Sequence, residues 1–153
     1  MNVLRATRKV QCAVWLVLVL GAVTVAAQST RTFKARLSPV PIDVSMQSTI
    51  AGTGSVTATL DGSTLTITGK YDGLKTPATV ARVHRAFRGT RGPSFAELKL
   101  SGGTSGTITG QLALTKDQIG ELGKSLFYVQ LHSEKAPDGN LWGWLVPDTG
   151  KQK

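Results

Sequence analysis

The sequence predicts a single all-β domain, an antiparallel β-sandwich of seven or eight short strands with one short helix. Apolar residues alternate with polar ones between Thr30 and Pro147, which is the period of a strand that buries one face. Glycine and proline interrupt this alternation repeatedly, as the turns of a compact all-β domain require. A third observation is the Asp61-Gly62 pair, which separates two alternating runs and is typical of a β-hairpin.

The hairpin around Asp61-Gly62 is the clearest local signal. Threonines alternate with apolar residues on both sides of this pair. A two-residue Asp-Gly loop favours a type I′ turn, because both central residues then need a positive φ. The implied register pairs Ala58 with Leu65 and Val56 with Ile67 on one face, and threonine with threonine on the other.

The remaining elements follow from the same alternation. The other strands are predicted over Thr32–Leu37, Ala78–Ala86, Phe95–Leu100, Thr107–Leu114, Leu126–His132 and Leu141–Val146. A short helix is predicted over Lys116–Leu122, because Thr115 can cap it and Gln118 completes a capping box. We expect a loop containing Pro137-Asp138-Gly139 between the last two strands. The tail from Asp148 to Lys153 is expected to fray.

The first 27 residues are predicted to be a secretory signal peptide. Arg5, Arg8 and Lys9 give a positive start, and an uncharged, mostly apolar stretch follows from Val10 to Val25. Small residues precede the expected cut after Ala27. The alternative is a retained membrane anchor, although a stretch of 16 residues is shorter than the roughly 20 that span a bilayer.

Cleavage would leave one domain over residues 28–147 and a short tail over 148–153. The product is expected to be secreted or periplasmic and to have no membrane span. The signal peptide also contains Cys12, the chain's one cysteine, so the exported domain must be stable without disulfides.

The charge balance is basic. The chain has 18 Lys and Arg against nine Asp and Glu, and loss of three cations with the signal peptide leaves a net charge of +6. Nucleic acid is not expected as a partner of an exported protein whose charge forms no long stripe. The charge suits an anionic wall polymer, a lipid headgroup or a sulfated glycan, or it serves solubility alone.

The last two predicted strands place aromatic side chains on one face. Aliphatic residues such as Val129 and Leu141 share the face expected to form the core. The opposite face carries a candidate ligand set made of His132, Tyr128, Trp142 and Trp144, together with His84 from the strand that begins at Ala78. Such a face is either a platform for sugar rings or partner side chains, or it is covered by the segment Ser38–Ser55.

A cluster of arginines accompanies His84. Arg82, Arg85, Arg88 and Arg91 fall within ten residues, partly on a glycine-containing loop. Guanidinium groups grip anions by bidentate contacts, so these four are candidate anion contacts. The other interpretation is that they are simply solvated.

A series of short segments covers most of the mature chain. They are Phe33-Lys34-Ala35-Arg36-Leu37, Pro41, Gly52 or Gly54, Asp72-Gly73-Leu74, Ala81-Arg82-Val83-His84, Tyr128-Val129-Gln130-Leu131-His132, Pro137, Gly139 and Gly143-Trp144-Leu145. In this order and spacing the chain resembles the CHRD domain, the module first described in chordin and found in many exported bacterial proteins.

Two segments depart from the family pattern. The family has Ala-His-Ile-His where this chain has Ala81-Arg82-Val83-His84, so Arg82 replaces a histidine. The family's Gly-Glu-Ile-Arg-Gly appears as Gly139-Asn140-Leu141-Trp142-Gly143, without its carboxylate and its arginine. The resemblance implies an immunoglobulin-like β-sandwich or barrel with no established enzymatic activity.

These residues bear on three possible functions. The favoured one is a non-catalytic binding or structural module whose partner is an extracytoplasmic protein, a glycan or an anionic polymer. The alternative is a copper or zinc site that uses His84 and His132 and loosely resembles superoxide dismutase. The competing interpretation of the two histidines is structural: each ring forms hydrogen bonds that tie neighbouring strands together. Catalysis is not expected, because no nucleophile with its base, no paired carboxylates and no phosphate loop occur.

Overall fold

The computed structural model describes residues 29–41 and 43–150. The predicted signal peptide, its cleavage site and Cys12 lie outside the described residues, as does the end of the tail from 151 to 153. The elements in chain order are β1 (Arg31–Pro39), η1 (Val44–Met46, one 3-10 turn), β2 (Thr53–Asp61), β3 (Thr64–Asp72), β4 (Ala78–Arg85), β5 (Ser94–Leu100), β6 (Gly106–Ala113), α1 (Lys116–Gly123), β7 (Phe127–Ser133), β8 (Ala136–Trp144) and β9 (Val146–Pro147).

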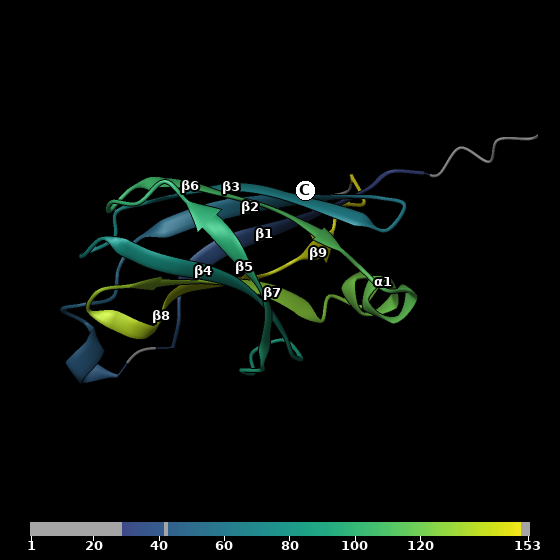
Figure 1. Cartoon of the computed structure of the whole chain (residues 1–153). Coiled ribbons are helices and arrows are strands. Elements are labelled where there is room, and N and C mark those ends of the chain that lie inside the picture. Colours follow the sequence, from purple (N-terminus) through teal and green to yellow (C-terminus); the bar gives the residue numbers. More distant parts are fainter. Residues whose placement is uncertain (1–28, 42, 151–153) are drawn as a thin grey trace, which may run out of the picture.

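The strands form a closed antiparallel barrel. In the described part of the chain, eight strands pair in the order β1-β2-β3-β6-β5-β4-β7-β8, and β8 returns to β1 to close the ring. The short β9 pairs with the other end of β1. Figure 1 shows β2, β3 and β6 on one side of the barrel and β7 and β8 on the opposite side. The predicted all-β antiparallel fold with one short helix is therefore confirmed, in its barrel form.

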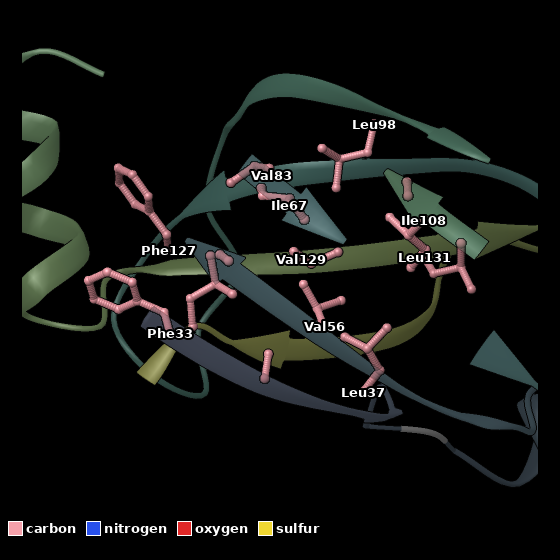
Figure 2. Packing of buried hydrophobic residues seen from close by; sticks show 14 of the residues in the cluster. Phe33, Leu37, Val56, Ile67, Val83, Leu98, Ile108, Phe127, Val129 and Leu131 are labelled. Carbon is pink, nitrogen blue, oxygen red and sulfur yellow. The ribbon is translucent and has the colours of Figure 1, made fainter. Parts of the chain in front are cut away.

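The barrel interior is filled by the apolar residues of the alternating strands. Figure 2 shows Phe33 and Leu37 of β1 on one side of Val129 and Leu131 of β7, with Ile108 of β6 next to Leu131 on the other side. All five are at most 1% exposed. Each such side chain contributes about 1.5–3 kcal/mol when it is fully buried, so this interior is the main stabilising feature of a domain without disulfides.

The β2–β3 hairpin forms as predicted, but its register is shifted by two residues. Ala58 pairs with Ile67 and not with Leu65, and Asp61 pairs with Thr64. The loop is therefore Gly62-Ser63, in which only Gly62 has a positive φ, of 58°. One glycine with positive φ at the first central position is the requirement of a type II′ turn, so the predicted type I′ turn is wrong. The faces are unaffected, because a shift of two keeps each side chain on its side.

The helix α1 begins where the sequence predicted it. The Thr115 hydroxyl accepts a hydrogen bond from the Gln118 amide, and the Gln118 side chain accepts one from the Thr115 amide, which completes the capping box. α1 lies at one end of the barrel (Figure 1) and contributes Leu122 to the interior. Within the described residues, no helix has the length and apolar character needed to cross a bilayer.

The connection between β7 and β8 is tighter than predicted. Ser133 pairs with Ala136, so the turn consists of Glu134 and Lys135 alone. Pro137-Asp138-Gly139 belongs to β8 and is not a loop; it lies at the register shift between the Ser133–Ala136 and Leu131–Leu141 pairs. This start of β8 lies beside His132 and Gln130, and its backbone carbonyl groups become partners of both side chains.

Candidate functional site

The candidate ligand residues lie together on the outer surface of the barrel. Alternation turns Val83, Val129 and Leu141 inward and leaves their neighbours on β4, β7 and β8 facing outward. β7 pairs with β4 on one side, which sets His84 opposite Tyr128, and with β8 on the other, which sets Tyr128 opposite Trp144. The predicted faces are confirmed for all three strands.

The five rings form a continuous row across these strands. Tyr128 is central: its ring centroid lies 4.8 Å from that of His84 and 4.8 Å from that of Trp144. Trp144 contacts Trp142 edge to face, with ring centroids 4.7 Å apart, and the ring centroids of His84 and His132 are 6.4 Å apart. We call this set the aromatic row. Close aromatic pairs contribute about 0.5–1.5 kcal/mol beyond their buried area, so the row is held rigidly.

Most of the aromatic row is covered. A covering segment, residues 40–52 as far as they are described, packs Val40 and Ile50 against Tyr128 and Trp142 in a second apolar cluster. Tyr128 is 0% exposed and Trp142 is 9% exposed, whereas Trp144 keeps an intermediate exposure. In Figure 1 the covering segment lies beside β8, at the lower left. This face was predicted either to form a ligand platform or to be covered by another segment. Tyr128 and Trp142 are covered, whereas Trp144 borders the solvent.

Both histidines are fixed by backbone carbonyl groups. Nδ1 of His84 lies 2.9 Å from the carbonyl oxygen of Gly92, and Nδ1 of His132 lies 2.7 Å from that of Pro137. A carbonyl oxygen only accepts, so Nδ1 carries the proton and donates in both rings. In a neutral ring with that tautomer, Nε2 carries a free lone pair.

The two Nε2 atoms are buried and have no hydrogen-bond partner among the described residues. Burial lowers the pKa of both imidazoles below the ordinary value, against the hydrogen bonds to Gly92 and Pro137. Arg82 and Arg91 lower both pKa values further, because a second positive charge is disfavoured beside them. Both rings are therefore neutral at neutral pH, with two lone pairs held in the protein interior.

No larger metal cluster accompanies the two histidines. Within residues 29–41 and 43–150, no group of three or more His, Cys, Asp or Glu side chains is arranged to hold an ion. A tetrahedral zinc site takes four ligands when it is structural and three when it is catalytic. The predicted histidine pair is thus brought together, but without the carboxylate that a zinc site would add.

The four candidate anion contacts are dispersed rather than joined in one site. Arg82 pairs with Glu97 at 3.5 Å, and Arg85 pairs with Glu121 at 3.3 Å. Arg91 donates to the carbonyl oxygen of Asp138 at 2.9 Å, which ties the β4–β5 loop to the start of β8. Of the four, Arg88 forms neither an ion pair nor a side-chain hydrogen bond with another described residue, and it borders a groove.

This groove borders the aromatic row at Trp142 and Trp144 and has a volume of about 650 Å³. β1 pairs with β9 through Phe33 and Lys34 and with β8 through Ser38 and Pro39, so its middle residues lie between two ladders. The groove opens at this break. We call it the tryptophan groove; its lining residues are Lys34, Ala35, Arg36, Ser38, Ser55, Val56, Thr57, Arg88, Trp142, Gly143, Trp144 and Val146.

Lys34 and Arg36 line this groove, although neither was predicted as a candidate site residue. The sequence does indicate that both side chains face outward, because they alternate with Phe33, Ala35 and Leu37. What the alternation does not give is their position beside Trp144, which depends on β8 closing the barrel against β1.

The segments that resemble the CHRD domain are spread over the whole barrel, from β1 to the end of β8. The sequence matches the CHRD domain over residues 33–145. The chain belongs to the CHRD domain family. No curated protein and no solved structure matches the sequence.

The matched CHRD region contains the entire aromatic row. The two segments that depart from the family pattern, at Arg82 and at Asn140–Trp142, each form defined contacts in the structure. Arg82 directs its guanidinium to Glu97 on β5. Asn140 is fully buried and donates to the Ser133 hydroxyl at 2.8 Å, and Trp142 packs under the covering segment. Apolar packing and one neutral hydrogen bond thus occupy the positions of the family's charged pair.

Proposed function

We propose that this CHRD domain is a non-catalytic extracytoplasmic binding module whose ligand is an anionic glycan, held in the tryptophan groove. The observation that carries the proposal is the composition of the groove lining. It combines the edge of the aromatic row with Lys34, Arg36 and Arg88 and includes no carboxylate.

Charge complementarity favours an anionic ligand. Arg36 and Arg88 are exposed, and neither forms an ion pair with another described residue. Lys34 is partly neutralised by Asp148, whose carboxylate lies 2.7 Å from its ammonium group. Two guanidinium groups beside one groove suit the carboxylate or sulfate groups of an acidic sugar chain, since both groups accept bidentate hydrogen bonds.

The aromatic side of the groove favours a sugar over a simple anion. Trp144 is partly exposed and is braced by Trp142 and Tyr128, so its ring has a fixed orientation. A flat, preorganised aromatic surface buries ligand area at little entropic cost. The hydroxyl groups of Ser38, Ser55 and Thr57 line the same groove and can exchange hydrogen bonds with sugar hydroxyls.

The absence of acid–base groups in the groove supports binding without catalysis. Among its described lining residues there is no histidine, cysteine, aspartate or glutamate, so a nucleophile activated by histidine and a carboxylate pair have no candidates there. The predicted signal peptide supports export, which favours glycans, anionic polymers and proteins over nucleic acids as partners.

The test is a binding titration with defined probes. The purified protein is titrated at low salt with a heparin oligosaccharide, with a polygalacturonate oligosaccharide and with neutral dextran, and tryptophan fluorescence and calorimetry are recorded. We expect the acidic probes to bind and dextran not to bind. Arg36→Ala and Trp144→Ala are each expected to weaken binding about tenfold, the loss of one charge-assisted or stacking contact.

The matched control is Lys99→Ala, which removes one exposed cation from β5 outside the groove. It should leave the affinity within a factor of about two. Equal weakening by Lys99→Ala and Arg36→Ala would show that net charge alone attracts the probe. Unchanged affinity in Arg36→Ala and Trp144→Ala would exclude the tryptophan groove as the binding site.

A further inference from the structure

We propose that His84 and His132 bind a single copper(I) ion between their Nε2 atoms. This site is separate from the tryptophan groove and stands independently of the glycan proposal. The observation behind it is a pair of buried nitrogen lone pairs, on rings from adjacent strands, that no other described residue satisfies.

The rings are preorganised as ligands. Each donates its Nδ1 proton to a fixed backbone carbonyl group, that of Gly92 or that of Pro137. This is the hydrogen bond that orients metal-binding histidines and leaves Nε2 free to coordinate. The stack on Tyr128 holds His84 from a second side. Little reorganisation is then needed when an ion enters.

The spacing of the rings fits one bridging ion. The centroids of His84 and His132 are 6.4 Å apart, and the planes are inclined by 30°. Two imidazoles that share an ion, each nitrogen ~2 Å from it, have centroids roughly 6 Å apart when they face each other end on. The observed centroid separation is close to this value.

The ligand set and the surrounding charge select the ion. Copper(I) is a closed-shell monovalent ion that two neutral nitrogen donors satisfy in a near-linear arrangement, and imidazole is a common copper ligand. Zinc requires further ligands, and among the described residues no third His, Cys, Asp or Glu side chain is placed to complete such a site. The nearby Asp138 carboxylate attracts a cation at His132 electrostatically. Arg82 and Arg91 lie near enough to influence both rings, and their repulsion acts twice as strongly on a divalent ion.

The orientation of the arginines reduces that repulsion for a monovalent ion. Arg82 is drawn toward Glu97, and Arg91 toward the carbonyl oxygen of Asp138. Gln130, which pairs with Arg82 across the β4–β7 ladder, also donates to the carbonyl oxygen of Asp138 at 2.8 Å. Two buried neutral nitrogen donors without a coordinating carboxylate favour a soft, weakly hydrated ion over a hard one.

The first test uses the protein with Cys12→Ser, which removes the chain's one thiol and thus a competing copper(I) ligand. Copper(I) is added under anaerobic conditions against a chromophoric competitor, and zinc(II) is added in a parallel titration. We expect one equivalent of copper(I) to be retained, with the X-ray absorption edge of a two-coordinate nitrogen site, and zinc to bind at least a hundredfold more weakly. Failure to retain copper(I), or a preference for zinc, overturns the proposal.

Variants and nuclear magnetic resonance complete the test. His84→Gln and His132→Gln should each abolish retention, whereas Lys70→Gln on β3 should not. Because the chain has two histidines, its imidazole ¹⁵N spectrum has only two ring systems, so the test does not depend on the variants folding. Copper(I) should shift both Nε2 signals and leave both Nδ1 protons in place. A buried water that donates to both nitrogens is the competing occupant, and it predicts no shift on adding copper(I).

Discussion

His84 and Tyr128 stack their rings 4.8 Å apart and bond the same backbone residue, Gly92. The His84 ring donates to the Gly92 carbonyl oxygen, and the Gly92 amide donates to the Tyr128 hydroxyl at 3.1 Å. The loop between β4 and β5 is thereby fastened to β7 through one residue. This loop also carries Arg88, which lines the tryptophan groove. The position of Arg88 therefore depends on the contacts that His84 and Tyr128 make with Gly92.

Tyr128→Phe tests the fastening by removing one hydroxyl group from a ring that otherwise stays packed. The Gly92 amide loses its acceptor, and we expect the free energy of unfolding to fall by about 1 kcal/mol. Chemical denaturation measures this change, and hydrogen exchange should show faster exchange at the Gly92 amide. An unchanged midpoint together with an equally protected Gly92 amide would contradict the role assigned to this hydroxyl.

Gly92→Ala tests the close approach at the same residue. A Cβ atom there would overlap the carbonyl oxygen of Arg85, and backbone cannot yield as a flexible side chain does. We expect a loss of roughly 1–3 kcal/mol in the free energy of unfolding. Gly120→Ala is the matched control, since its Cβ meets nothing within 4 Å and lies in α1, where alanine stabilises by up to about 1 kcal/mol. Equal effects of the two substitutions would contradict this account of Gly92.

Local patterns in the sequence predicted the strands, their faces and the helix. Alternation places Tyr128 and Trp144 on one face and Val129 on the other, whatever the overall closure of the sheet. The capping box of Thr115 and Gln118 involves only four consecutive residues, so its sequence signal was sufficient. These features depend on neighbours in the chain, and the chain alone specifies them.

Features that depend on distant segments were not predictable in the same way. The tryptophan groove exists because β1 changes partner between β8 and β9, and no local pattern encodes that change. The free Nε2 atoms depend on carbonyl groups of Gly92 and Pro137, which come from a loop and from a strand start. The sequence predicted that His84 and His132 share one face, but not which nitrogen each would leave free.

Ile50→Ala tests the covering segment. Ile50 is 6% exposed and packs with Trp142 and Tyr128, so its truncation leaves a cavity over the aromatic row. We expect a loss of about 2–4 kcal/mol and a red-shifted tryptophan emission in the folded protein. Val44→Ala in the same segment is the control, because Val44 is 84% exposed and its truncation should cost under about 0.5 kcal/mol. A variant whose emission and stability match those of Val44→Ala would show that Ile50 does not shield Trp142.

Asp148→Asn tests the balance of charge in the tryptophan groove. Asp148 neutralises Lys34, so its replacement by asparagine frees a groove-lining cation while keeping the side-chain oxygen that accepts from the Gly150 amide. We expect the affinity for the heparin oligosaccharide to rise about two- to fivefold, the range of one exposed ion pair. Asp61→Asn makes the same change of net charge at the β2–β3 turn, outside the groove, and should have a smaller effect.

The pH dependence of this effect has a defined sign. The hydrogen bond from Lys34 holds the pKa of Asp148 below its ordinary value, so the carboxylate stays ionised and paired at neutral and mildly acidic pH. The stabilising contact is fully present above the ordinary carboxyl pKa and is lost as the pH falls through the lowered one. The gain from Asp148→Asn should therefore be constant across neutral and mildly acidic solutions in a binding titration, and it should disappear only in strong acid, where the wild-type carboxylate is itself protonated. A gain that already declines near neutral pH would show that a group other than Asp148 controls Lys34.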